Sequence, residues 1–284
     1  MPKLIAVIDG SAYSSSVCEH AAWVANRAGY DVDVVHVLSR RSTASEQSNY
    51  SGSIGLGARS ALLSELAELD AQQARLAQKR GRAILVDAEA LLSQLGVSTV
   101  HTRLRNGEIA ETVQDLEHDA DLIVIGKRGE SADFETLHLG PNLERVARAT
   151  KKPVLVAARR FRAPAKVLLA FDGGASAMKA VEYFASQSHY QDLPCHLLSV
   201  ARDSTHDRRQ LEGAAATLRE SGYQVTAENL PGAPENVIAE KVESDGFDLL
   251  IMGAYGHSRI RNLIIGSTTT EMIRSCKVPV LLFR

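Results

Sequence analysis

Residues 248–253 read Asp-Leu-Leu-Ile-Met-Gly, and residues 121–126 read Asp-Leu-Ile-Val-Ile-Gly, so the chain carries nearly the same stretch twice. Both copies are unbroken apolar runs that end on glycine. They lack the polar alternation of a strand that has one face in water. Such runs are typical of strands buried on both faces, as in a parallel sheet that is covered by helices. The pair therefore predicts two copies of one α/β unit.

Two further pairs of matching segments extend the repeat to both ends of the chain. Residues 4–9 (Leu-Ile-Ala-Val-Ile-Asp) match residues 167–172 (Val-Leu-Leu-Ala-Phe-Asp). Residues 152–157 (Lys-Pro-Val-Leu-Val-Ala) match residues 278–283 (Val-Pro-Val-Leu-Leu-Phe). A two-copy repeat of this length indicates domain duplication rather than a solenoid.

Within each half, apolar runs alternate with helical patterns, which is typical of a doubly wound α/β fold with five strands per half. We place the domains at residues 1–158 and 163–284, because arginines and a proline interrupt the apolar pattern in residues 158–165. The first half also carries an insertion. Its residues 59–95 are rich in Ala, Leu, Glu and Gln, which predicts one long helix with Gly81 as a candidate break.

The composition excludes several classes of protein. The 284 residues are 45% hydrophobic and 23% charged, as in an ordinary globular chain, and the net charge of -2 gives no basic excess for nucleic acid or an anionic membrane. No apolar stretch approaches the roughly 20 residues that span a bilayer. The short apolar run at the N-terminus does not resemble an export signal. Three scattered cysteines form no disulfide framework. We therefore expect a cytoplasmic protein.

The second half carries a glycine pattern at the place where ligands bind in this fold class. In open parallel sheets, ligands lie beyond the carboxyl ends of the strands. There the chain reads Gly253-x2-Gly256-x9-Gly266-Ser267-Thr268, with a helix predicted to begin at Ser267. Glycines let the backbone approach a phosphate, and a helix N-terminus offers N–H groups and the positive end of its dipole. The pattern predicts a polyphosphate cradle that differs from the P-loop.

These features together resemble the tandem type of the universal stress protein family, over nearly the whole chain. The resemblance implies an adenine nucleotide alpha hydrolase-like fold with strand order 3-2-1-4-5 in each half, and ATP, with Mg²⁺ as an optional companion, in the cleft. It implies that Asp172 faces the ribose or adenine and that the backbone of Val200 meets the adenine edge. Ribose and phosphates would be held by Gly253, Gly256, Gly266, Ser267 and Thr268. The pocket would be lined by Met252, Ala254 and His257.

The first half departs from this pattern. It retains Gly126-Lys-Arg-Gly129, but ten residues rather than nine precede Gly140, and Pro141 and Asn142 replace the Ser-Thr pair. Proline has no N–H group, so phosphate donors are lost. Asp9 and Val37 are retained at the other corners of the site. We therefore expect one nucleotide per chain, in the second half.

The same residues also have structural interpretations. Glycines often serve turns or close helix–sheet packing, and Asp172 would serve equally as a helix cap. His257 would equally be a solvated loop residue. No histidine spacing typical of a metal site occurs, so we predict no metal ligands.

The function that we infer is a nucleotide-responsive stress or regulatory module rather than an efficient enzyme, because the motif contains no evident general base. Slow ATP hydrolysis assisted by Mg²⁺ is compatible with it. Two alternatives stay open: an adenine-nucleotide-dependent enzyme, such as a transferase, and an interaction protein whose motif is a relic.

The last strand of each half should lie at a sheet edge. These strands, residues 154–157 and 280–283, are apolar, and an exposed apolar edge invites pairing with another strand. In single-domain members of the family that the chain resembles, a second subunit supplies that strand. Here we expect the two edges to pair antiparallel within one chain, as an intramolecular pseudo-dimer. A further homodimer stays open.

Overall fold

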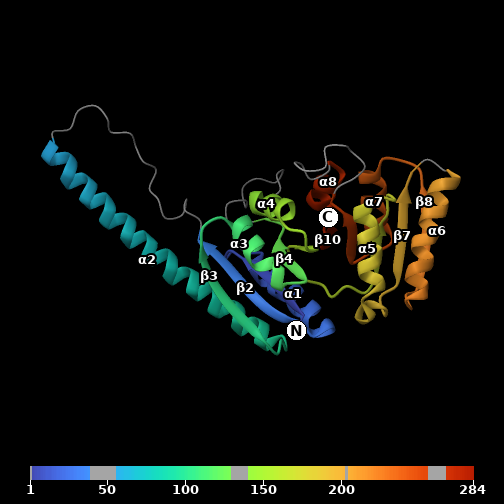
Figure 1. The fold of residues 1–284 in the computed structure, drawn as a ribbon, viewed down its shortest axis with the longest axis horizontal. Coiled ribbons are helices and arrows are strands. Elements are labelled where there is room, and N and C mark those ends of the chain that lie inside the picture. Colours follow the sequence, from blue (N-terminus) through green and yellow to red (C-terminus); the bar gives the residue numbers. More distant parts are fainter. Residues whose placement is uncertain (1, 39–55, 129–139, 202–203, 255–266) are drawn as a thin grey trace.

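Ten strands form one continuous sheet within the part of the chain that the computed structural model describes (Figure 1). The described residues are 2–38, 56–128, 140–201, 204–254 and 267–284.

The first half of the chain contributes five strands with helices between them. In chain order its elements are β1 (Lys3–Ile8), α1 (Ser14–Ala28), β2 (Asp31–Leu38), α2 (Leu56–Gln94), β3 (Val100–Asn106), α3 (Ile109–Leu116), η2 (Glu117–Asp119), β4 (Leu122–Gly126), α4 (Pro141–Ala149) and β5 (Val154–Ala157).

The second half repeats this succession. Its elements are β6 (Val167–Ala170), α5 (Ala175–Ala185), η4 (Ser188–Tyr190), β7 (Cys195–Val200), α6 (Thr205–Glu220), β8 (Val225–Leu230), α7 (Pro234–Ser244), β9 (Leu249–Gly253), α8 (Ser267–Ser275) and β10 (Val280–Phe283).

The strand order is β3-β2-β1-β4-β5-β10-β9-β6-β7-β8, so each half has the expected order 3-2-1-4-5. Within each half all pairings are parallel; Leu4, for example, pairs with Val32 on one side and Leu122 on the other. Helices cover both faces. One apolar core lies under α1, α2, α5 and α6, and a second lies under α3, α4, α7 and α8. The unbroken apolar runs are strands buried on both faces, as their composition predicted.

The two halves meet through their last strands, which confirms the intramolecular pairing expected from the sequence. β10 runs antiparallel to β5, with Leu281 opposite Leu155 at the centre of a three-residue register. A second contact joins α1 to η4, where the Trp23 and Tyr190 rings stack with centroids 5.6 Å apart. Beside them Arg27 makes a two-pronged ion pair with Asp192, with both N···O distances at 2.7 Å. The junction therefore combines a backbone ladder with aromatic and charged side-chain contacts.

Helix α2 runs unbroken through Gly81, so the prediction of one long helix is confirmed and the candidate break does not occur. A Cβ atom at this position would lie 2.7 Å from Leu104 Cδ1 and 3.0 Å from His36 Cδ2. Glycine therefore lets the helix approach β2 and β3 closely. Figure 1 shows that only the later part of α2 covers the sheet, while its beginning extends past the sheet edge.

None of the helices in the described ranges is long and apolar enough to cross a membrane.

Candidate functional site

In the second half, the carboxyl ends of three neighbouring strands bring the predicted residues together. β6 lies between β7 and β9, with Ala170 paired to Leu198 and to Met252. Asp172 therefore emerges between the end of β7, at Val200, and the end of β9. This is the edge of the sheet at which the sequence placed a ligand.

The start of α8 is attached to the same edge. The Thr269 hydroxyl lies 3.3 Å from the carbonyl oxygens of both Gly253 and Ala254, to which it donates. Thr269 is buried, and Thr268 beside it is half-buried. The N-terminus of α8, with its N–H groups and positive dipole end, consequently lies next to the end of β9.

The carboxylate of Asp172 has a local structural role. Its Oδ1 accepts a hydrogen bond of 2.9 Å from the N–H of Gly174, the residue directly before α5. Asp172 is exposed at the strand end. Asp172 therefore holds the turn that leads into α5 and does not cap the helix itself, whose N-cap residue is Gly174. Its carboxylate stays at the surface of the predicted site.

Gly253 has a packing role at the end of β9. A Cβ atom there would lie 3.0 Å from Ser176 Cβ and 3.3 Å from the backbone nitrogen of Ala177. Its counterpart Gly126 is also required for close packing, because a Cβ atom there would lie 2.9 Å from Tyr13 Cβ. In both halves the glycine that ends the fourth strand lets the first helix pack closely against the sheet.

Part of the predicted cradle cannot be placed. Gly256, His257 and Gly266 lie outside the described residues, and so does the side chain of Ser267, although its backbone begins α8. The described part of the predicted site consists of Asp172, Val200, Met252, Gly253, Ala254 and Thr268.

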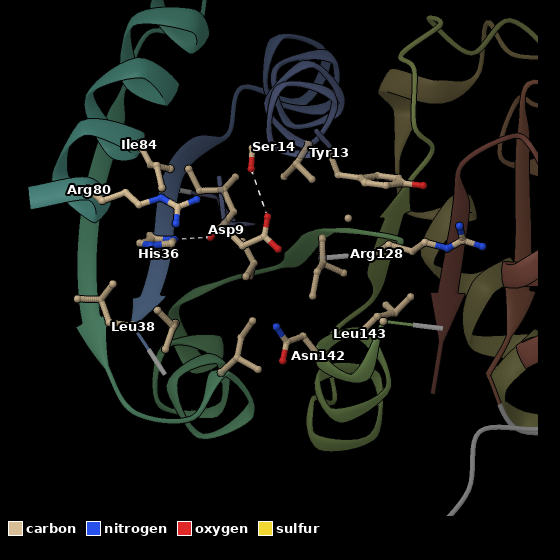
Figure 2. A pocket seen from close by; sticks show the side chains of 18 of the residues that line it. Asp9, Tyr13, Ser14, His36, Leu38, Arg80, Ile84, Arg128, Asn142 and Leu143 are labelled. Carbon is tan, nitrogen blue, oxygen red and sulfur yellow. Dashed lines mark hydrogen bonds between the residues drawn. The ribbon is translucent and has the colours of Figure 1, made fainter. Parts of the chain in front are cut away.

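The first half holds a cavity of about 820 Å³ at the equivalent edge of its own sheet (Figure 2). Pockets of roughly 300–1,000 Å³ are the usual size for small-molecule ligands. Asp9 and Val37, the corners that the sequence retained, both line it. Its wall also includes Tyr13, Ser14, His36, Arg80, Ile84, Arg128, Pro141, Asn142 and Leu143.

Asp9 repeats the local geometry of Asp172. Its Oδ1 accepts a 3.0 Å hydrogen bond from the N–H of Ser11 and a 3.5 Å contact from the Ser14 hydroxyl. Gly10, between these residues, has φ +79°, and a Cβ atom there would lie 2.5 Å from Ile84 Cδ1. Helix α2 is thus pressed against the loop that carries Asp9.

Helix α2 contributes to this wall, which was not predicted from the sequence. Figure 2 shows Arg80 and Ile84 reaching from α2 toward the cavity, near the ring of His36. The His36 ring is fixed because Nδ1 donates to the carbonyl oxygen of Ile8 at 2.9 Å. Arg80 and Ile84, four residues apart, share one helix face, but this spacing alone does not show what that face meets. Arg128 lies on the opposite side of the cavity.

The N-terminus of α4 differs from that of α8 in its donors. α4 begins at Pro141, which has no N–H, and Asn142 presents a side-chain amide to the cavity (Figure 2). The guanidinium of Arg80 reaches toward the same cavity from α2. The loss of the Ser-Thr pair therefore leaves a ligand-sized cavity whose polar groups differ from the predicted cradle.

Cysteine chemistry has no support at either edge. All three cysteines are buried, and burial raises the pKa of Cys18 and Cys195 to about 12 and that of Cys276 to about 11. Each is a neutral thiol at physiological pH and a poor nucleophile. Within the described ranges, no three His, Cys, Asp or Glu side chains converge as a metal site would require.

The structure thus defines a duplicated, doubly wound α/β protein whose candidate sites lie at the carboxyl ends of its strands. The sequence model of the universal stress protein family matches residues 1–158 and again residues 165–284. The chain belongs to this family.

Two curated relatives and one solved structure match the chain over nearly its whole length. Universal stress protein Slr1230 of Synechocystis sp. is 38% identical over 100% of both chains. A universal stress protein of Mycolicibacterium smegmatis is 23% identical over 98% of this chain and 95% of its own. The crystal structure of a universal stress protein from Archaeoglobus fulgidus superposes with a TM-score of 0.73 at 19% identity, covering 99% of this chain and 98% of its own.

Proposed function

We propose that this universal stress protein binds an adenine nucleotide, ATP or a close relative, at the carboxyl edge of its second half. The observation that carries the proposal is the attachment of α8 to the end of β9 by Thr269, beside Asp172. That arrangement aims a helix N-terminus at the edge where Asp172 and the backbone of Val200 end their strands. An anionic phosphate is the group that such a terminus favours.

The roles of individual residues follow the same proposal. Asp172 would accept hydrogen bonds from the ribose hydroxyls or the adenine, and Thr268 would contact phosphate. Gly256, Gly266 and Ser267 complete the cradle on the evidence of their spacing alone. If Mg²⁺ accompanies the nucleotide, it would neutralise phosphate charge.

We propose a nucleotide-responsive stress module of the cytoplasm, with residues 1–158 and 163–284 as its two domains. Among the described residues at the second edge, Asp172 is the one carboxylate that the sequence assigned to the site, and it already binds the Gly174 N–H. This supports a binding role over fast catalysis, with slow hydrolysis as the upper limit. A transferase that uses the same nucleotide is the alternative.

The cavity of the first half favours a second candidate function, the binding of an additional anionic small molecule. The Arg80 guanidinium and the Asn142 amide face the cavity and offer hydrogen-bond donors to an anion, and the volume of about 820 Å³ suits a nucleotide-sized ligand. The expectation of one nucleotide per chain applies to the tight site in the second half.

The test is to identify what the purified protein carries and how much it binds. Mass spectrometry of the small molecules released on denaturation should detect an adenine nucleotide. Calorimetry with ATP should give one tight site per chain, and ATP at 100 times its Kd should stabilise the fold by about 2.7 kcal/mol. The absence of both a carried nucleotide and any thermal shift with ATP, ADP or AMP would refute the proposal and favour the relic motif.

A further inference from the structure

The wall of the first-half cavity is mostly apolar. Its lining residues come from the ends of β1, β2 and β4 and from helices α1 to α4, and apolar side chains outnumber polar ones among them. Helix α2 adds Leu76, Ala77 and Ile84 to this wall. The ribose and phosphates of a nucleotide are polar and would make little use of such a surface. The lining therefore favours a ligand with a larger apolar body.

Leu76 lies at the mouth of the cavity. It belongs to the lining and yet is 65% exposed, whereas Ile84, two turns further along α2, is half-buried. A ligand that covers an exposed leucine removes apolar surface from water, and this burial stabilises the complex. The mouth of the cavity can therefore bind the apolar part of a ligand as well as its polar part.

The polar groups of the cavity suit a single acidic head better than a chain of phosphates. The Arg80 guanidinium reaches in from α2, and the Asn142 amide faces the cavity from the first turn of α4 (Figure 2). Asp9 also lines the cavity, with its Oδ1 bound to the N–H of Ser11. Its negative charge repels every charge that a ligand carries, so the cost is smallest for one acid group.

We propose that the first-half cavity binds an amphipathic carboxylic acid of the fatty-acid class. The acid group lies at Arg80 and Asn142, and the hydrocarbon chain packs on the apolar wall that ends at Leu76. This assignment rests on the second candidate function, an anionic ligand in this cavity, and names the class of that ligand. It is independent of the nucleotide proposed for the second half.

Calorimetry on the full chain with laurate, used below its micelle concentration, tests the proposal. The wild type should bind one laurate per chain, and prior saturation with ATP should change that affinity by less than about twofold, because the sites are separate. Leu76→Gln should weaken laurate binding about tenfold through lost apolar contact. Leu63→Gln is the matched control and should bind as the wild type does, since Leu63 is 58% exposed on the same helix but lies outside the described lining.

Two charge variants test the position of the acid group. Arg80→Gln should weaken laurate binding about tenfold and leave unchanged the binding of dodecanol, the neutral alcohol with the same chain length. Asp9→Asn keeps an acceptor for the Ser11 N–H and removes a repelling charge, so it should tighten laurate binding about threefold. A nucleotide in this cavity would respond in the opposite direction, because its hydroxyls would lose a charged acceptor.

Circular dichroism checks that each variant is folded. The proposal is overturned if the wild type shows no saturable laurate binding, or if folded Leu76→Gln and Leu63→Gln bind laurate equally. It is also overturned if ATP displaces laurate, if Asp9→Asn binds laurate more weakly, or if Arg80→Gln loses laurate and dodecanol to the same extent.

ATP binding measured on the same samples separates this inference from the nucleotide proposal. One tight ATP site without laurate binding refutes the fatty-acid assignment alone. Laurate binding without any ATP binding supports the assignment and refutes only the nucleotide in the second half.

Discussion

The ammonium group of Lys127 donates a 2.7 Å hydrogen bond to the carbonyl oxygen of Cys276. Lys127 belongs to the glycine motif of the first half, and its own carbonyl oxygen accepts a hydrogen bond from Gly140, the residue before α4. Cys276 directly follows α8, the helix whose other end faces the proposed nucleotide. A cation is favourable at a helix C-terminus. One side chain thus joins the edge of the first half to the helix that serves the second.

Stability should depend on pH through Lys127. Burial lowers the pKa of Lys127 from 10.5 to about 8 in the folded protein. Between these values the unfolded chain binds more protons than the folded one, so the stability from this group rises with pH across that window. The unfolding free energy of the wild type should therefore rise relative to that of Lys127→Met from pH 7.5 to pH 9.5, as measured by urea denaturation. A difference that stays constant over this range would contradict the buried setting of the amine.

Gly253 and Gly213 should respond in opposite directions to alanine. Gly253→Ala places a Cβ atom 3.0 Å from Ser176 Cβ and should destabilise the protein by about 1–3 kcal/mol. Gly213, inside α6, has open space around its Cβ position, so Gly213→Ala should stabilise by about 0.5–1 kcal/mol through helix propensity. Thermal unfolding of both variants without nucleotide measures the two effects. If Gly253→Ala melts at the same temperature as the wild type, Gly253 has no packing role.

The fold could be predicted from the sequence because its determinants are local and repeated. The apolar runs around Leu122 and Leu250 predict strands buried on both faces. Duplication then supplies two complementary edge strands, which pair through Leu155 and Leu281. The order of strands came from family resemblance rather than from periodicity.

The site could be predicted only in part, because its contacts join residues far apart in the chain. Nothing near Gly81 shows that Leu104 and His36 will pack against it, so helix propensity made this glycine a candidate break in the predicted long helix. The spacing of glycines predicts a phosphate near Gly253, but its packing against Ser176 could not be predicted, because that contact requires the folded α5. The cavity wall formed by Arg80 depends on where α2 docks, which no local pattern specifies.

Acid should weaken the fold through His20. The side chain is buried in α1, its Nδ1 donates to the Ser16 carbonyl oxygen at 2.7 Å, and its ring meets the edge of Phe161 in the connection between the halves. Burial lowers its pKa below 6.5, so the unfolded chain takes up a proton first as the pH falls. Stability from this group is therefore lost below about pH 6.5. His20→Asn, which can keep the donor to Ser16, should lose less melting temperature than wild type between pH 7.5 and 5.5. The exposed His118→Asn is the control, and an unchanged pH response in His20→Asn would count against this origin.

The two aspartates that follow the first strands provide a matched test of where the nucleotide binds. Asp172 and Asp9 each hold a backbone N–H two residues later, at Gly174 and Ser11. Asparagine can accept the same hydrogen bond, so Asp172→Asn and Asp9→Asn should keep both turns and remove only a charge. Loss of a charged acceptor from a ligand hydroxyl costs about 1.5–3 kcal/mol. Calorimetry with ATP should therefore show affinity falling at least tenfold for Asp172→Asn and staying unchanged for Asp9→Asn. The reverse pattern would place the nucleotide in the cavity between Asp9 and Arg80, and the second half would then lose its proposed role.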